Sequence, residues 1–192
     1  MEGLLPFAAA FALVALLEIG DKTQLANISL ASRHPWRPVF AGAAAGLVTA
    51  TAIGVAVGAA IAAIAEGWLL AIKVAGGLVF MAFGIWGYLR HEEKERAPEG
   101  NRSALAQAFS FNLLAEMGDK TQIAVIVIAA REAAPISVFA GASAGLVAVT
   151  ALGLVVGQQL GRRLPPARVR LVSAVLFVGA GIVLVAEALL RS

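Results

Sequence analysis

Long apolar segments separated by short polar breaks make up most of this chain. Six segments can be distinguished, and each reaches or exceeds the roughly 20 residues that a helix needs to cross a bilayer. Their apolar residues run continuously instead of alternating, which predicts helices and argues against the strands of a membrane barrel. The predicted helices cover residues 4–30, 39–65, 68–89, 103–130, 136–160 and 169–190.

A similar sequence unit occurs before and after the one clearly hydrophilic stretch of the chain, residues 90–102. Residues 18–24 read Glu-Ile-Gly-Asp-Lys-Thr-Gln, and residues 116–122 read Glu-Met-Gly-Asp-Lys-Thr-Gln. Each copy belongs to a unit of three segments, and an odd number sends the second unit into the membrane from the opposite side. We therefore predict an all-α membrane protein with six transmembrane helices as two inverted three-helix repeats. Its parts are the repeat 1–90, a linker loop 91–102 and the repeat 103–192.

Glycines recur at helical spacing in the second segment of each unit. They form four Gly-x3-Gly pairs, which predict close packing between helices. The pairs are Gly42–Gly46, Gly54–Gly58, Gly141–Gly145 and Gly153–Gly157. Gly20 and Gly118 lie inside the two acidic motifs, where glycine indicates either local unwinding or close approach of another helix.

The composition points to a chain surrounded by lipid. Charged residues are 14% of the 192, hydrophobic types are 60%, and the mean hydropathy is +0.86. An ordinary soluble domain has about 25% charged and 45–50% apolar residues. These values exclude a disordered chain and argue against a soluble enzyme. Cysteine is absent, which excludes disulfides, thiolate metal ligands and a cysteine nucleophile.

Basic residues are distributed unevenly between the two predicted faces. The linker side carries ten of the fifteen Lys and Arg, the other side three, and the motifs two. By the positive-inside rule, the linker is cytoplasmic and both termini are periplasmic. The formal net charge of +3 is thereby assigned to cytoplasmic loops, and no nucleic-acid partner is predicted. The lipid bilayer is the expected surrounding partner, and the oligomeric state is unknown from this pattern.

Each motif places acidic residues well inside an apolar segment. An ionised side chain at membrane depth costs a few kcal/mol or more, so it needs a partner or water. One interpretation is ion pairing between motifs, Glu18 or Asp21 with Lys120 and the second pair of acids with Lys22. The other is a polar cation site between the inverted helices, near the midplane. The second is favoured because four carboxylates outnumber two lysines, and both can hold if the lysines are resting counter-ions.

The donor atoms near the motifs are hard oxygens. Hard donors suit Mg²⁺, Ca²⁺ and Mn²⁺, whereas Zn²⁺ and Cu⁺ prefer imidazole and sulfur. Both histidines, His34 and His91, fall in predicted loops. The predicted metal ligands are Glu18, Asp21, Glu116 and Asp119, with Gln24, Gln122, Asn112, Thr23 and Thr121 as neutral or supporting donors.

Outward movement of a dication against an inside-negative potential needs an energy source. About 2.3 kcal/mol per charge per 100 mV must be supplied, and the chain has no Gly-x4-Gly-Lys-Ser/Thr phosphate loop for ATP. A proton or sodium gradient is the alternative, and carboxylates that exchange protons for metal provide the coupling. No cofactor is predicted, because the divalent cation is the transported substrate. A passive cation channel stays open as an alternative. An intramembrane enzyme is disfavoured because no Ser/His pair or metal-binding His lies at membrane depth.

The doubled Glu-x-Gly-Asp-Lys-Thr motif, one copy per three-helix unit, resembles uncharacterised protein family 0016. This family comprises manganese and calcium transporters related to the lysine-exporter superfamily. The resemblance covers essentially the whole chain and implies that Glu18, Asp21, Glu116 and Asp119 are the cation ligands. It also implies exchange of Mn²⁺ for protons, with Ca²⁺/proton exchange as the second choice. A short form without a long N-terminal extension is expected in a bacterial inner membrane.

Overall fold

A computed structural model describes residues 3–19, 21–64, 69–89, 103–132, 134–160 and 166–190. Those residues form eight helices and no strand, which confirms the all-α prediction. The helices are α1 Leu4–Glu18, α2 Lys22–Ala31, α3 Trp36–Ile64, α4 Leu69–Leu89, α5 Ala104–Glu116, α6 Lys120–Arg131, α7 Pro135–Leu160 and α8 Pro166–Leu190. The predicted linker 91–102 lies outside the described residues.

Two of the predicted segments, 4–30 and 103–130, are each divided into two helices at the acidic motif, where local unwinding was one of the two possibilities considered. The first is divided into α1 and α2, and the fourth into α5 and α6. The axes of Leu4–Glu18 and Thr23–Ala31 differ by 69°. In the described part of the chain, Trp36–Ile64 and Pro135–Val155 are long and apolar enough to span a membrane. The bent pair adds a third span if it is counted as one.

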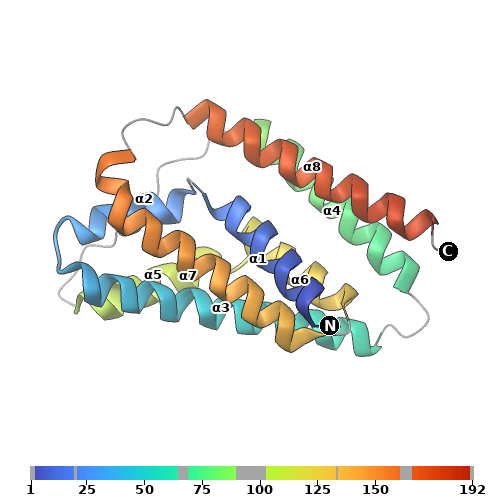
Figure 1. The fold of residues 1–192 in the computed structure, drawn as a ribbon, viewed down its shortest axis with the longest axis horizontal. Helices are drawn as coiled ribbons and strands as arrows, with labels where there is room; N and C mark the ends of the chain where they lie inside the picture. Colours follow the sequence, from blue (N-terminus) through green and yellow to red (C-terminus); the bar gives the residue numbers. More distant parts are fainter. Residues whose placement is uncertain are drawn as a thin grey trace.

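The two halves of the chain are interleaved and do not stand side by side. Helix α3 of the first half packs on α5 and α6 of the second, and α7 of the second half packs on α1 and α2 of the first. Figure 1 shows these six helices as one bundle, with α4 and α8 lying along each other beside it. Each broken helix pair is therefore held against the unbroken helix of the other half.

Seven glycines of the predicted pairs lie at these crossings, and the surroundings of Gly157 are outside the described part of the structure. A Cβ added to Gly46 of α3 would lie 2.6 Å from the Phe109 carbonyl oxygen of α5. A Cβ on Gly145 of α7 would lie 2.9 Å from the Phe11 carbonyl oxygen of α1. Backbones that approach this closely leave no room for a side chain, so the prediction of close helix packing is confirmed at these crossings.

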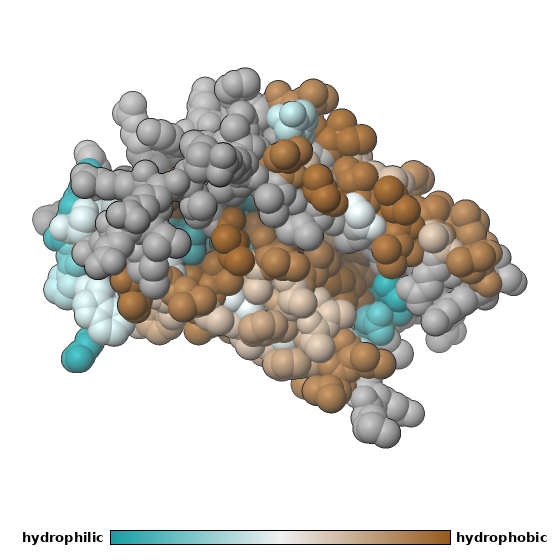
Figure 2. Space-filling view, turned by 45° about the horizontal axis from the view of Figure 1, so that its top comes forward, coloured by the Kyte–Doolittle hydropathy of each residue, from teal (hydrophilic) through white to brown (hydrophobic). Residues whose placement is uncertain are grey.

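The outer surface of the bundle is largely apolar. Leu114, Ile136 and Val155 are 72%, 81% and 73% exposed. In Figure 2, hydrophobic residues cover the middle of the face shown, and hydrophilic residues gather toward its ends. Exposed apolar area on this scale is unfavourable in water and suits contact with lipid tails.

Candidate cation site

Both acidic motifs lie at a break between two helices. Helix α1 ends at Glu18 and α2 starts after Asp21, while α5 ends at Glu116 and α6 starts after Asp119. The two aspartates occupy N-cap positions, where a short carboxylate can satisfy free backbone N–H groups; the Asp21 side chain does so, and the Asp119 side chain makes no such cap hydrogen bond. The Asp21 carboxylate accepts a hydrogen bond of 3.3 Å from the Thr23 N–H. The motif thus ends one half-helix on a glutamate and starts the next on an aspartate.

Gly118 provides the turn at the second break. Its φ of +82° is in the left-handed region, which glycine adopts without the steric cost that other residues have. The Gly118 N–H donates to Gln122 Oε1 at 2.6 Å, and Gln122 Nε2 lies 3.4 Å from Met117 Sδ. Of the two roles considered for this glycine, local unwinding is confirmed. The corresponding Gly20 lies outside the described residues.

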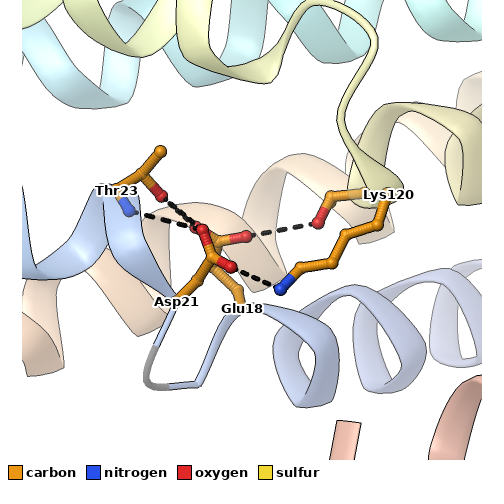
Figure 3. Close-up of polar contacts among 5 residues, drawn as sticks. Glu18, Asp21, Thr23 and Lys120 are labelled. Carbon is orange, nitrogen blue, oxygen red and sulfur yellow. Dashed lines mark hydrogen bonds and ion pairs between the residues drawn. The ribbon is translucent and has the colours of Figure 1, made fainter. Parts of the chain in front are cut away.

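Hydroxyl groups from both motifs converge on Glu18, which is 2% exposed. Thr23 Oγ1 lies 3.0 Å from Glu18 Oε1 and 3.1 Å from Asp21 Oδ2, and donates to one of them at a time (Figure 3). Thr121 Oγ1, from the second motif, donates to Glu18 Oε2 at 3.3 Å. The first motif's glutamate is therefore bound by threonines of both halves.

An ion pair also joins the two motifs. The Lys120 ammonium contacts Asp21 Oδ1 (Figure 3), and the Asp21 side chain is fully buried. This contact confirms the predicted pairing of a first-motif acid with Lys120. The side chain of Lys22, predicted to pair with the second-motif acids, lies outside the described part of the structure. At least one lysine thus acts as a counter-ion within the site.

Glu116 has a different environment from Glu18. It is 2% exposed, and its Oε1 atom is buried with no hydrogen-bond partner in the structure. The charges of Glu18, Asp119, Asp21 and Lys120 all act on it. A buried carboxylate oxygen without a donor is costly, and a bound cation or proton would remove that cost. In the described residues no three acidic or histidine side chains are close enough to hold one metal ion. Joint coordination by both motifs therefore requires the carboxylates to turn toward one another.

The predicted neutral donors are placed in three different ways. Thr23 and Thr121 contact the carboxylates as described above. Gln24 Nε2 instead donates to the Val149 carbonyl of α7 at 3.1 Å, and Gln122 binds its own turn. Asn112 pairs with Asn27, which the sequence reasoning missed. The sequence does carry a signal for Asn27, because it is an amide inside an apolar segment.

Half-helices that meet at buried acidic residues, inside a bundle with an apolar exterior, are typical of membrane transporters. The profile of the family described as "Divalent cation/proton antiporter GDT1" matches residues 6–95 and again residues 104–192. The chain belongs to this family.

Named relatives agree with the family assignment. A Vibrio cholerae protein named "Putative manganese exporter" is 30% identical over 178 residues, covering 89% of this chain and 86% of that protein. A GDT1-like protein of Synechocystis sp. is 28% identical over 190 residues, 89% of this chain and 92% of its own. The chloroplastic protein PAM71 of Arabidopsis thaliana is 31% identical over 210 residues, 94% of this chain but only 56% of its own. No solved structure matches significantly.

Proposed function

We propose that this antiporter exports Mn²⁺ in exchange for protons, with Ca²⁺ as the second-choice substrate. The main support for this proposal is the pair of glutamates at the helix breaks. Each is 2% exposed, and one of them has a buried oxygen without a hydrogen-bond partner. The surrounding donors are oxygens, which hard divalent cations prefer. The Vibrio cholerae relative's printed name favours manganese over calcium.

The charges of the motifs suggest how exchange is coupled. Four carboxylates and two ammonium groups, when all are ionised, carry a net charge of −2. One dication or two protons neutralise that charge, and metal binding requires deprotonated carboxylates. Mn²⁺ would bind from the cytoplasm, the repeats would reorient, and two periplasmic protons would displace the metal. In this cycle Lys120 holds Asp21 when no cation does.

The proposal is tested by Mn²⁺ flux in proteoliposomes with an imposed pH gradient. Mn²⁺ should move toward the compartment of lower pH, because protons leave that compartment in exchange. With one dication exchanged for two protons, the initial rate should not respond to a membrane potential set with potassium and valinomycin. Flux that ignores the pH gradient would exclude antiport and favour the passive channel. Parallel runs with Ca²⁺ rank the two substrates.

The proposed topology has six spans in a bacterial inner membrane, as two inverted repeats around a midplane site. Three features support it: the matching helix breaks in the two halves, the family profile that matches twice, and the start of α1 at the same end of the bundle as the end of α8 (Figure 1). Ser32 and Ser103 are exposed at the end assigned to the cytoplasm, and Glu132 lies at the other.

Thiol labelling distinguishes the two faces, because the chain has no cysteine of its own. Ser32→Cys and Ser103→Cys should react with a membrane-impermeant maleimide only after permeabilisation of spheroplasts. Glu132→Cys should react with intact spheroplasts. The reverse pattern would invert the orientation, and labelling of Ser32→Cys and Ser103→Cys from different sides would reject the inverted-repeat topology.

A further inference from the structure

Two half-helix pairs lie on opposite sides of the motifs, and the repeat relates them. Helices α1 and α6 contact each other on one side, and α2 and α5 on the other. In the repeat, α1 corresponds to α5 and α2 to α6, because the motifs recur 98 residues apart. The α1–α6 contact and the α2–α5 contact are therefore equivalent to each other under the repeat.

The α2–α5 contact is polar at its centre. Asn27 and Asn112 donate to each other's side-chain oxygens, both at 2.8 Å, and Asn112 also donates to the Ala108 carbonyl at 2.8 Å. Their side chains are almost fully buried, at 2% and 0% exposed. Asn112 lies one helical turn before Glu116, roughly 6 Å along the axis, and Asn27 roughly 9 Å beyond Asp21. The amide pair thus lies about two helical turns or less from the carboxylates, where α2 faces α5.

The equivalent layer of the α1–α6 half is apolar. The same offset relates Asn112 to Val14 and Asn27 to Val125. Both valines are buried, at 0% and 1% exposed, in one apolar cluster with Leu47 and Ile128. The fold therefore accepts a pair of valines at this position, so packing alone does not require the two amides on the other side.

Amides and valines differ in what they offer a cation when the helices separate. In the closed pair each amide oxygen accepts a hydrogen bond and three of the four amide N–H groups donate one, which makes the pair tolerable in an apolar bundle. Once opened, it presents two carbonyl oxygens that can replace water around a hard cation. Separated valines offer no such ligand, so a cation that passes between them would lose water ligands without replacement, which is energetically unfavourable.

We propose that Asn27 and Asn112 form a polar gate and transient oxygen ligands for the cation on the α2–α5 side, whereas Val14 and Val125 form the apolar seal on the other. The inference rests on the proposed transport function. It assigns cation entry to the end of the bundle that carries Ser32 and Ser103, because α2 ends there and α5 begins there.

The test replaces both asparagines by valine, the residue found at the equivalent positions of the other half. Asn27→Val/Asn112→Val should fold with a thermal midpoint close to that of wild type, whereas either single substitution should be less stable because it leaves one buried amide unpaired. Mn²⁺ flux of the double variant should fall about tenfold or more. The matched control is Thr51→Val/Thr150→Val, which removes two buried hydroxyls of α3 and α7 outside the pair, and it should keep wild-type flux.

A second variant separates a gate from a structural contact. Asn27→Ser/Asn112→Ser retains an oxygen at each position, so its flux should exceed that of the valine pair and stay within about threefold of wild type. Wild-type flux in the valine variant, or equal losses in folded serine and valine variants, would overturn the gate. If the valine variant does not fold, the flux of the serine variant decides. Absence of Mn²⁺ flux in the wild-type chain would reject the transport function itself, which is a different result.

Discussion

The double substitution Glu18→Gln/Glu116→Gln is expected to reduce pH-driven Mn²⁺ flux by about 100-fold or more, since even supporting residues around a metal contribute 10–100-fold. The two side chains keep their shape but lose the charge that a dication needs and the proton that exchanges for it. At position 18 the amide oxygen can accept a hydrogen bond from one of the two threonines, Thr23 or Thr121, and the amide N–H can donate to the hydroxyl oxygen of the other. Transport in proteoliposomes is the measurement.

The stability of this variant should not fall together with its flux. Glu18 and Glu116 are both 2% exposed, and burial of ionised groups opposes folding. Their neutral replacements should therefore leave the thermal midpoint of the purified protein unchanged or raised. Glu132→Gln is the matched control, since Glu132 lies at the end of the bundle, 3.4 Å from Arg131, and it should transport normally. Intact flux in the double glutamine variant would remove both glutamates from the site.

Long apolar segments made the unbroken helices predictable. The predicted helix 39–65 is observed as Trp36–Ile64, 68–89 as Leu69–Leu89, and 136–160 as Pro135–Leu160. The predicted and observed boundaries agree because these helices end where the apolar sequence ends. Whether 4–30 and 103–130 break was left open between unwinding and close packing at Gly20 and Gly118, because a hydropathy average over 20 residues hides three polar ones. Yet glycine followed by aspartate is a helix stop followed by an N-cap, so the local signal for the break was present.

Contacts between the two halves were only partly predictable. Opposite charges in a duplicated motif allowed the Asp21–Lys120 pair to be proposed before the fold was known, and the structure contains it. The Asn27–Asn112 pair depends on how α2 faces α5 across 85 residues of chain. That arrangement follows from the interleaving of the halves, in which α3 and α7 each pack on the broken helices of the other half. No local propensity encodes such an arrangement.

Lys120→Gln is expected to lower the thermal midpoint strongly, and Mn²⁺ is expected to restore it. The substitution leaves the fully buried Asp21 carboxylate without its ammonium partner, a change that costs about 3–5 kcal/mol in buried pairs. For a chain of this size that corresponds to a drop of roughly 10 °C. Arg131→Gln, which alters a partly exposed ion pair at the end of the bundle, should shift the midpoint little.

The response to Mn²⁺ distinguishes a counter-ion from a purely structural lysine. If Lys120 holds the place of the transported cation, Mn²⁺ should stabilise Lys120→Gln more than wild type, because the metal no longer has to displace the ammonium from Asp21. A ligand at 100 times its dissociation constant adds about 2.7 kcal/mol, enough to recover much of the loss. Asp21→Asn/Lys120→Gln removes both charges, so it should regain stability without metal and lose the Mn²⁺ response. Equal Mn²⁺ shifts in wild type, Lys120→Gln and the double variant would mean that Asp21 and Lys120 do not belong to the cation site.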